Sequence, residues 1–281
     1  IIMNSKERVI ASINHRESDR LPIDFDSTSV TGMHVTRVKA LRDYYGLEKR
    51  PVKVWEPYQM LGEIEGDLAD AIGIDTVGLP APGTMFGFKN ENWKEFQAPW
   101  RQDLLVPGKF NVAEEPNGDF LMYPDGDTAA PPSARMPSGG FFFDAVIRQA
   151  PIDDENLNPE DNMEEFHPFS NTDLTYFKEQ AAMLSASERA VVGNIGGTGF
   201  GDIALVPAPF LKQPKGIRDV EEWYVSTVTR QDYIHQVFER QCDVAIENLE
   251  RVHPIIGGVV DIIFICGTDF GTQTSTFCST D

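Results

Sequence analysis

Apolar residues recur every three or four positions in five segments of the chain, which is the spacing of one helix face. Asn4-Ser5-Lys6-Glu7 opens the first segment and has the form of a capping box. Gly46 and Gly73 follow the second and third segments, where a glycine commonly ends a helix. The pattern predicts helices over about residues 5–13, 35–45, 61–72, 174–184 and 230–252.

Four short apolar runs lack the alternation of apolar and polar residues that marks a half-exposed strand. They cover Leu21–Phe25, Ile74–Leu79, Ala190–Asn194 and Val259–Cys266. Such runs suit strands that are covered on both faces, as in a parallel sheet. Three of the runs follow a predicted helix after a short connection, so helix–strand units repeat. We therefore expect an α/β barrel or a doubly wound sheet.

The stretch from Pro80 to Pro151 interrupts this rhythm with many proline, glycine and tryptophan residues. Its turn signals predict an insertion of hairpins and loops. The phenylalanines at 141–143 are more typical of a core than of a ligand pocket. Between Glu114 and Asp173 there are 14 Asp or Glu residues against two Arg, so the excursion at about residues 80–170 is acidic. A solvated surface accounts for this charge, and so does a lid or a docking face for a basic partner.

Composition narrows the class of protein. The chain has 281 residues, 41% of them hydrophobic, which suits one enzyme-sized domain over 1–281. Its net charge of −20 argues against nucleic acid, because phosphate backbones require a basic surface. No apolar stretch approaches the ~20 residues of a membrane span, and the first residues lack a signal peptide's apolar region. The three cysteines have no CxxC spacing, which favours a reducing cytoplasmic compartment.

Asp269 is the strongest single candidate for chemistry. It lies in Gly267-Thr268-Asp269-Phe270-Gly271-Thr272-Gln273, directly after the last apolar run. A carboxylate at the carboxyl end of a buried strand costs desolvation unless it is paired, so we expect a catalytic role. The alternative is a structural carboxylate that accepts hydrogen bonds from its own loop. Gln273 can orient a substrate with its amide or simply hold the loop.

Three further residues are candidates for substrate binding. Asp26 follows the first predicted strand, and its alternative role is an exposed helix cap. His34 opens the next helix, where the positive end of the helix dipole favours a neutral ring. Asn194 precedes a glycine-rich loop that departs from the dinucleotide fingerprint, since Asp202 stands at the third glycine position. Nucleotide binding is therefore not expected, but a flexible loop beside a substrate is.

Metal-ligand spacing is missing from the printed sequence. The five histidines form no H-x-x-x-H or H-x-C pair, and no cysteine lies within three residues of one. Cys266 stands at a strand end where a thiolate can ligate zinc, although a buried inert thiol is the commoner finding. The residues alone thus indicate no metal site, with Cys266 the single candidate ligand.

Two sets of residues carry a family resemblance. Met3–Val9, Asn14–Glu17 and Asp19–Phe25 resemble the N-terminal signature of the uroporphyrinogen decarboxylase superfamily, and Gly216–Trp223 and Gly267–Gln273 are similar to its methyltransferase-like branch. The resemblance spans nearly the whole chain. It implies a TIM-type (β/α)₈ barrel, with its site at the carboxyl ends of the strands.

The two branches of that superfamily imply different chemistry. True uroporphyrinogen decarboxylases hold their acidic tetrapyrrole with an arginine-containing motif, but no arginine follows Phe25 here until Arg37. The resemblance therefore favours corrinoid-dependent methyltransferases and O-demethylases. In these, zinc polarises the substrate and a corrinoid protein exchanges the methyl group. The alternatives are a decarboxylase of a carboxylated, tetrapyrrole-like substrate, and a catalytically silent barrel that binds a partner.

The chain also ends before the family's His-x-Cys-Gly zinc motif would appear. About five strands can be predicted, whereas a barrel of this type has eight. We therefore expect a barrel that is truncated at its C-terminus, with the zinc ligands beyond Asp281. On this reading Asp269 orients or protonates the substrate, Gln273 and Asn194 hydrogen-bond it, and Asp26 or His34 lines the mouth.

Overall fold

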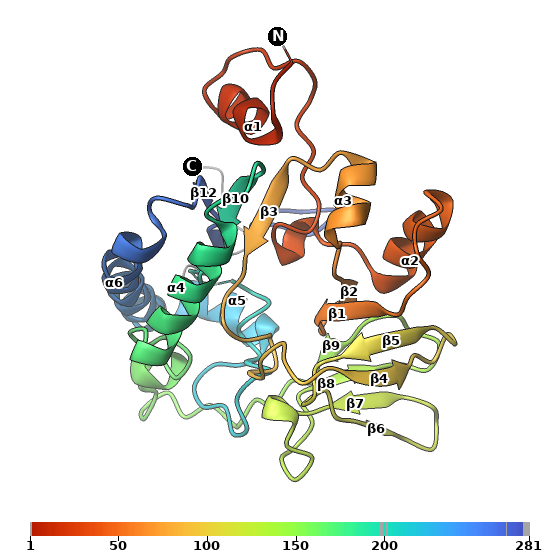
Figure 1. Cartoon of the computed structure of the whole chain (residues 1–281). Helices are drawn as coiled ribbons and strands as arrows, with labels where there is room; N and C mark the ends of the chain where they lie inside the picture. The colour runs from red at the N-terminus through yellow and green to blue at the C-terminus, as the bar shows by residue number, and fades with distance from the viewer. Residues whose placement is uncertain (1, 197–198, 201, 268, 278–281) are drawn as a thin grey trace.

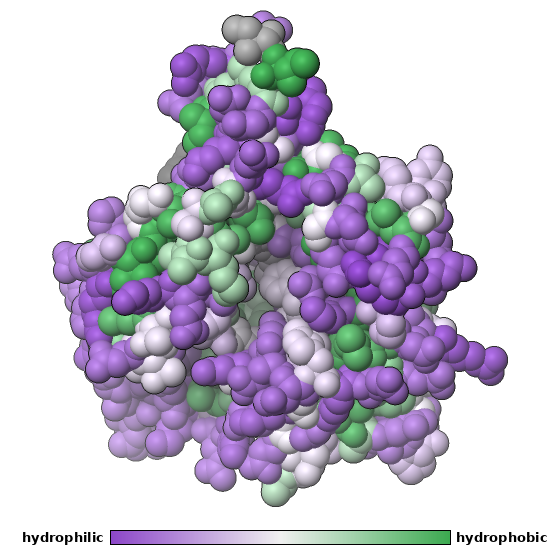
Figure 2. Space-filling model, in the orientation of Figure 1, coloured by the Kyte–Doolittle hydropathy of each residue, from purple (hydrophilic) through white to green (hydrophobic). Residues whose placement is uncertain are grey.

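The computed structural model describes residues 2–196, 199–200, 202–267 and 269–277. Its helices and short strands are arranged around a hollow near the centre of the face shown in Figures 1 and 2. The helices are α1 (Ser5–Ile13), α2 (Val35–Tyr44), α3 (Gly66–Ile72), α4 (Asn171–Leu184), α5 (Val220–Thr229) and α6 (Gln231–Ile256), with short 3₁₀ turns η1 (Ser29–Thr31), η2 (Pro124–Gly126) and η3 (Pro159–Asn162). No helix within the described residues is both long and apolar enough to cross a membrane.

The predicted helices form where capping and apolar spacing agree. In α1 the Asn4 side chain accepts a hydrogen bond from the Glu7 N–H, and the Glu7 carboxylate accepts one from the Asn4 N–H, so the capping box is confirmed. The long α6 buries one apolar stripe that includes Ile234, Val237 and Val252. The third predicted helix begins at Gly66, later than expected, because Leu61 and Gly62 pair as a strand with their neighbours.

A three-stranded parallel sheet lies beside α4 and α6 (Figure 1). It consists of β12 (Ile262–Ile263), β10 (Ala190–Gly193) and β3 (Thr76–Leu79), in that order. The register places Ala190 opposite Thr76 and Val192 opposite Ile262. The sheet and the two helices share a buried core that contains Leu79, Phe177, Val191, Ile195 and Val252.

Two four-stranded sheets occupy the other half of the molecule, below α2 in Figure 1. The first has the order β2-β1-β5-β4, from β1 (Val52–Glu56), β2 (Leu61–Gly62), β4 (Lys94–Gln97) and β5 (Asp103–Val106). The second has the order β6-β7-β8-β9, from β6 (Val112–Glu114), β7 (Phe120–Met122), β8 (Ala134–Met136) and β9 (Asp144–Ala145). All their pairs are antiparallel except β1 with β5. A short parallel pair of β11 (Gly199–Phe200) and β13 (Cys266–Gly267) completes the described strands.

The predicted eight-stranded barrel is wrong for the described residues, whose sheets have two to four strands and stay open. The error came from treating apolar runs as buried strands. Leu21 is 83% exposed and its run contains no strand, although the Asp75 N–H donates to the Ile23 carbonyl at 2.8 Å. Ile265 is 60% exposed, and only two residues of the last run belong to β12. Apolar residues that stay at the surface give no drive to close a sheet.

The signature-like residues near the N-terminus serve the fold. Asp75 is fully buried at the start of the parallel sheet, where its carboxylate binds the guanidinium groups of Arg8 at 2.6 Å and Arg20 at 2.7 Å. Burial alone would raise the pKa of Asp75, but the N–H of Ile23 and the two arginines lower it. This network joins α1 to β3. The motif therefore has a structural explanation that needs no barrel.

Candidate functional site

A cleft of about 680 Å³ lies between the start of α2 and the segment before β9. The α2 side contributes His34 and Arg37, and the turn after β1 contributes Tyr58 and Gln59. Its complete lining is His34, Thr36, Arg37, Tyr58, Gln59, Leu61, Met85, Phe141, Phe142, Phe143, Asp144 and Ala204. Ligand sites commonly combine such an apolar lining with a few polar groups.

His34 caps the N-terminus of α2 and holds both walls of the cleft together. Its Nδ1 accepts a hydrogen bond from the Thr36 N–H at 3.3 Å, and its Nε2 lies 2.9 Å from the Phe141 carbonyl oxygen. The carbonyl can only accept, so the Nε2 atom carries the proton of a neutral ring. Burial lowers the pKa of His34, as does the nearby charge of Arg37. The neutral ring expected from the sequence therefore agrees with the structure.

Aromatic rings form the other wall. The Phe141 ring lies 5.8 Å from the His34 ring and 5.3 Å from the Trp100 ring, measured between centroids. The side chains of Phe141 and Phe142 are 49% and 53% exposed, whereas Phe143 is 1% exposed. Only Phe143 belongs to the core, so the core interpretation is wrong for the first two phenylalanines. They present an apolar face to the cleft.

Two opposite charges stand in this lining. Arg37 is exposed, and its guanidinium makes no hydrogen bond or ion pair within the described part of the chain. Asp144 is the one carboxylate among the lining residues. A free guanidinium beside aromatic rings suits a ligand that joins an apolar body to an anionic group.

A buried carboxylate that the sequence did not single out fixes the floor of the cleft. Glu56 is 5% exposed, and its two oxygens accept the N–H groups of Tyr58 at 2.9 Å and Gln59 at 2.8 Å. Tyr58 in turn accepts the Phe143 N–H at its carbonyl and the Ala145 N–H at its hydroxyl, both at 2.8 Å. Burial raises the pKa of Glu56 to about 7. The sequence contained a signal for this residue, because Glu56 is a carboxylate at the end of a strand, directly before Pro57.

Asp26 is the second carboxyl group with a perturbed pKa. It adopts a left-handed backbone conformation with φ of 70° and accepts the Trp55 indole N–H at 2.6 Å and the Ile64 N–H at 2.8 Å. Burial raises its pKa to about 7, and the charges of Glu63 and Asp24 act in the same direction. A carboxyl group with such a pKa is half protonated near neutral pH, as a general acid requires.

The short strand β2 and the residues after it connect Asp26 to the cleft. His34 forms an isolated bridge with Leu61, while the carboxylate of Asp26 binds the Ile64 N–H three residues further on. The neighbouring Asp24 faces a different group, the hydroxyl of Thr76 on β3, at 2.6 Å. Of these two neighbouring carboxylates, Asp26 is thus the one held beside β2.

The expected environment of Asp269 and Gln273 is not present. Both residues are exposed; Gln273 lies in the turn that the pair Gly271 and Thr276 closes, and Asp269 lies just before that turn. The Tyr224 hydroxyl donates to the main-chain oxygen of Asp269 at 3.1 Å. No buried strand precedes the residue, so the desolvation argument for it does not hold. Thr268 lies outside the described residues.

Asn194 directly follows β10, as predicted, whereas Cys266 begins the short strand β13 and does not end a long buried strand. The Asn194 N–H donates to the Leu79 carbonyl at 2.9 Å, and Cys266 belongs to β13. Burial raises the pKa of Cys266 to about 11, and its hydrogen bond to Asp202 acts in the same direction, so the thiol stays protonated at neutral pH. The sulfur is therefore poorly suited to ligate zinc. Cys278 lies outside the described residues.

The described residues do not fit a zinc ion. Nowhere among them do three histidine, cysteine, aspartate or glutamate side chains gather as a metal site would require. The chemistry considered below therefore contains no step through zinc.

Comparisons with known proteins assign no family to the chain. Neither a protein-family model, nor a curated protein, nor a solved structure matches it.

Proposed function

We propose that the protein is an enzyme that binds a small methoxylated or methylated molecule in the cleft beside His34 and releases its methyl group to a corrinoid protein. The observation that carries this proposal is the pairing of an aromatic wall, Phe141 and Phe142, with the unpaired guanidinium of Arg37. This pairing favours an aromatic ring with an anionic substituent.

The protein's own residues then have separate tasks. Phe141 and Phe142 contact the apolar body of the substrate, and Arg37 binds its anionic group. Asp26 is not among the residues that line the cleft, so its protonated carboxyl group serves as the general acid through one water molecule that joins it to the substrate. When the ether bond between carbon and oxygen breaks, the electron pair stays on oxygen, and Asp26 donates the proton that oxygen needs. A reduced corrinoid, carried by a partner protein, supplies the nucleophile that accepts the methyl group.

Decarboxylation is the second candidate, and Arg37 itself favours it. The sequence argued against a carboxylated substrate because no arginine follows the first apolar run until Arg37. The structure brings this arginine into the cleft, where it can hold a carboxylate. In that reaction the bond to the carboxyl carbon breaks, carbon dioxide leaves, and Asp26 donates a proton to the carbon that is left behind.

One doubly labelled probe separates the two reactions. We would incubate the full chain and a reduced corrinoid protein with 4-methoxybenzoate that carries ¹³C in both its methyl and carboxyl groups. Methyl transfer predicts 4-hydroxybenzoate and a labelled methyl group on the corrinoid protein. Decarboxylation predicts labelled carbon dioxide. If neither product forms from this probe or from a panel of other methoxylated and methylated acids, the proposed enzymatic function is wrong.

Binding tests the site independently of turnover. We expect 4-methoxybenzoate to bind at least about tenfold more tightly than methoxybenzene, because a charge-assisted hydrogen bond contributes about 1.5–3 kcal/mol. Arg37→Gln should remove this preference. Lys39→Gln is the matched control, since Lys39 lies on the same helix and pairs with Asp43 outside the cleft. An unchanged preference in Arg37→Gln would contradict the proposed binding mode.

A further inference from the structure

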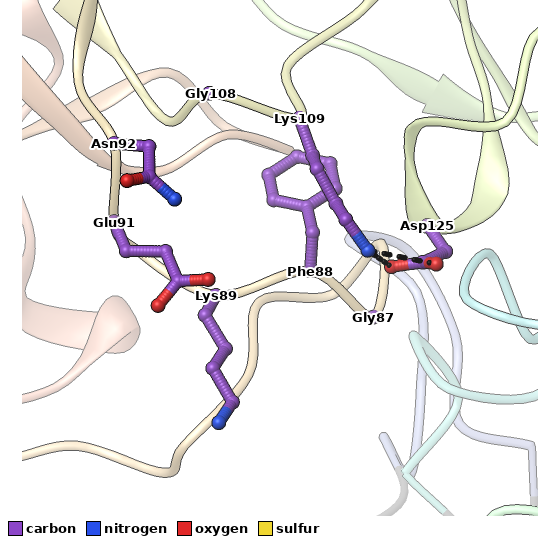
Figure 3. A pocket seen from close by; sticks show the side chains of 8 residues that line it. All are labelled: Gly87, Phe88, Lys89, Glu91, Asn92, Gly108, Lys109 and Asp125. Carbon is purple, nitrogen blue, oxygen red and sulfur yellow. Dashed lines mark hydrogen bonds and ion pairs between the residues drawn. The ribbon is translucent and has the colours of Figure 1, made fainter.

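A second cavity, of about 440 Å³, lies on the β-rich side of the molecule (Figure 3). It is formed by the segment before β4, the turn between β5 and β6, and η2. Its lining residues are Gly87, Phe88, Lys89, Glu91, Asn92, Gly108, Lys109 and Asp125. None of them lines the cleft beside His34, so this cavity is a separate place in the fold.

The walls of this cavity depend on close backbone contacts. A Cβ atom at Gly108 would lie only 2.8 Å from the Asn92 carbonyl oxygen, so glycine lets the two segments meet. Gly87 has φ of 87°, a conformation that a larger residue rarely adopts, and the Phe210 side chain lies behind it. The buried Phe88 ring stacks on Phe86 at 6.1 Å, measured between centroids, and supports the floor.

The charges around the cavity sum to zero, but only one cation and one anion among them form an ion pair with each other. Lys109 donates to both carboxylate oxygens of Asp125, at 2.8 and 3.0 Å. On the other side of Phe88, the side chains of Lys89 and Glu91 make no hydrogen bond or ion pair with any described residue (Figure 3). The two lysines, one glutamate and one aspartate give the lining no net charge. One cation and one anion therefore remain free to bind a ligand.

We propose that this cavity binds a small zwitterion of the α-amino acid type, with its carboxylate at Lys89 and its ammonium group at Glu91. A singly charged ligand would satisfy one of these residues and face a like charge at the other, which is unfavourable. A zwitterion satisfies both. The side-chain amide of Asn92 lies on the same side of the cavity as Glu91 and adds a neutral hydrogen-bonding group (Figure 3).

The test is an NMR titration of the full chain with L-alanine, and with acetate and ethylamine as its singly charged halves. We expect L-alanine to shift the amide signals of residues 87–92 and 108–109, and to bind at least about fivefold more tightly than either half. Absence of binding, or equal binding of the halves, would overturn the proposal.

Charge variants show whether Lys89 and Glu91 carry the binding. Lys89→Gln and Glu91→Gln should each weaken L-alanine binding by about threefold to fivefold, as expected for exposed ion pairs. The exchange Lys89→Glu with Glu91→Lys should restore it, because a reversed zwitterion meets reversed charges. Lys39→Gln should leave it unchanged. Lys39, Lys89 and Glu91 are all exposed, so thermal unfolding can verify that the variants stay folded. Weakened binding in the exchange variant, or unweakened binding in both single variants, would contradict the proposal.

Discussion

Asp26 and Asp269 show how differently two carboxylates at the ends of predicted strands can be placed. Asp26 is enclosed by Trp55 and Ile64, and burial raises its pKa to about 7. Asp269 is exposed, and the hydroxyl of Tyr224 binds its main-chain oxygen, not its carboxylate. The motif around Asp269 is the more conspicuous of the two in the sequence. A carboxyl group acquires a shifted pKa where other segments bury it, and these segments can be far away in the chain.

Asp26 and His34 are partly buried because β2 and its neighbours pack around them. The residues that close around Asp26 and His34 come from β1, β2 and the stretch that includes Phe141. The segment that follows Asp269 pairs Gly271 with Thr276, and Tyr224 both binds the main-chain oxygen of Asp269 and stacks its ring on Phe277 at 4.1 Å between centroids. Variants of Glu56, Asp26 and Asp269 compare the two regions directly.

The largest effect should follow from removing Glu56. Glu56→Ala leaves the N–H groups of Tyr58 and Gln59, both in partly buried hydrogen bonds, without their acceptor, and an unsatisfied donor costs about 1–3 kcal/mol where it is buried. We expect the free energy of unfolding to fall by about 2–4 kcal/mol in urea denaturation. Glu95→Ala, at an exposed strand position, should change it by less than about 0.5 kcal/mol. Equal losses in both variants would show that Glu56 does not hold the floor of the cleft.

The next largest effect concerns turnover at Asp26. Asp26→Asn removes the proposed general acid and should lower kcat by at least about 100-fold. Trp55→Phe is the matched control, because it deletes one hydrogen bond to Asp26 but keeps the carboxyl group. We expect this control to retain most of its turnover. If both variants lose the same activity, Asp26 acts only by supporting the structure.

The pH dependence of stability tests the environment of Asp26. Burial raises its pKa from the ordinary value of 3.8 to about 7, so its contribution to stability is fully present below about pH 4 and is lost as pH rises through 7. Between pH 4.5 and 7.5, the wild type should therefore lose about 3 kcal/mol more than Asp26→Asn does. Any constant cost of the substitution cancels in this comparison. Parallel stability curves would contradict the raised pKa.

The smallest effect should come from Asp269. Because its carboxylate is exposed and unpaired among the described residues, Asp269→Asn should change kcat and ligand affinity by less than about twofold. A fall in kcat as large as that of Asp26→Asn would show that Asp269 has the catalytic role and would contradict the assignment to Asp26.

Local signals in the sequence predicted local structure well. The capping box at Asn4 and the glycine at 73 mark real helix ends, and β3 and β10 lie within predicted strands. Long-range structure was predicted poorly. The run at Leu21–Phe25 is apolar but largely exposed, and nothing in its own residues reveals that the fold leaves it at the surface.

The candidate site follows the same rule. Asp26 and His34 were recognised because each stands at the end or start of a predicted element. Phe141 was assigned to the core because three adjacent phenylalanines usually lie there, yet the chain turns so that only Phe143 is buried. Arg37 could not be placed, since its position opposite Phe141 depends on a contact across more than one hundred residues of chain.

An NMR map of 4-methoxybenzoate binding tests the central comparison most directly. We predict that the largest amide shifts occur at His34, Arg37 and Phe141, and that Asp269 and Gln273 stay unshifted. Shifts that concentrate at residues 269–273 and leave His34 unchanged would contradict the assignment of the cleft as the substrate site.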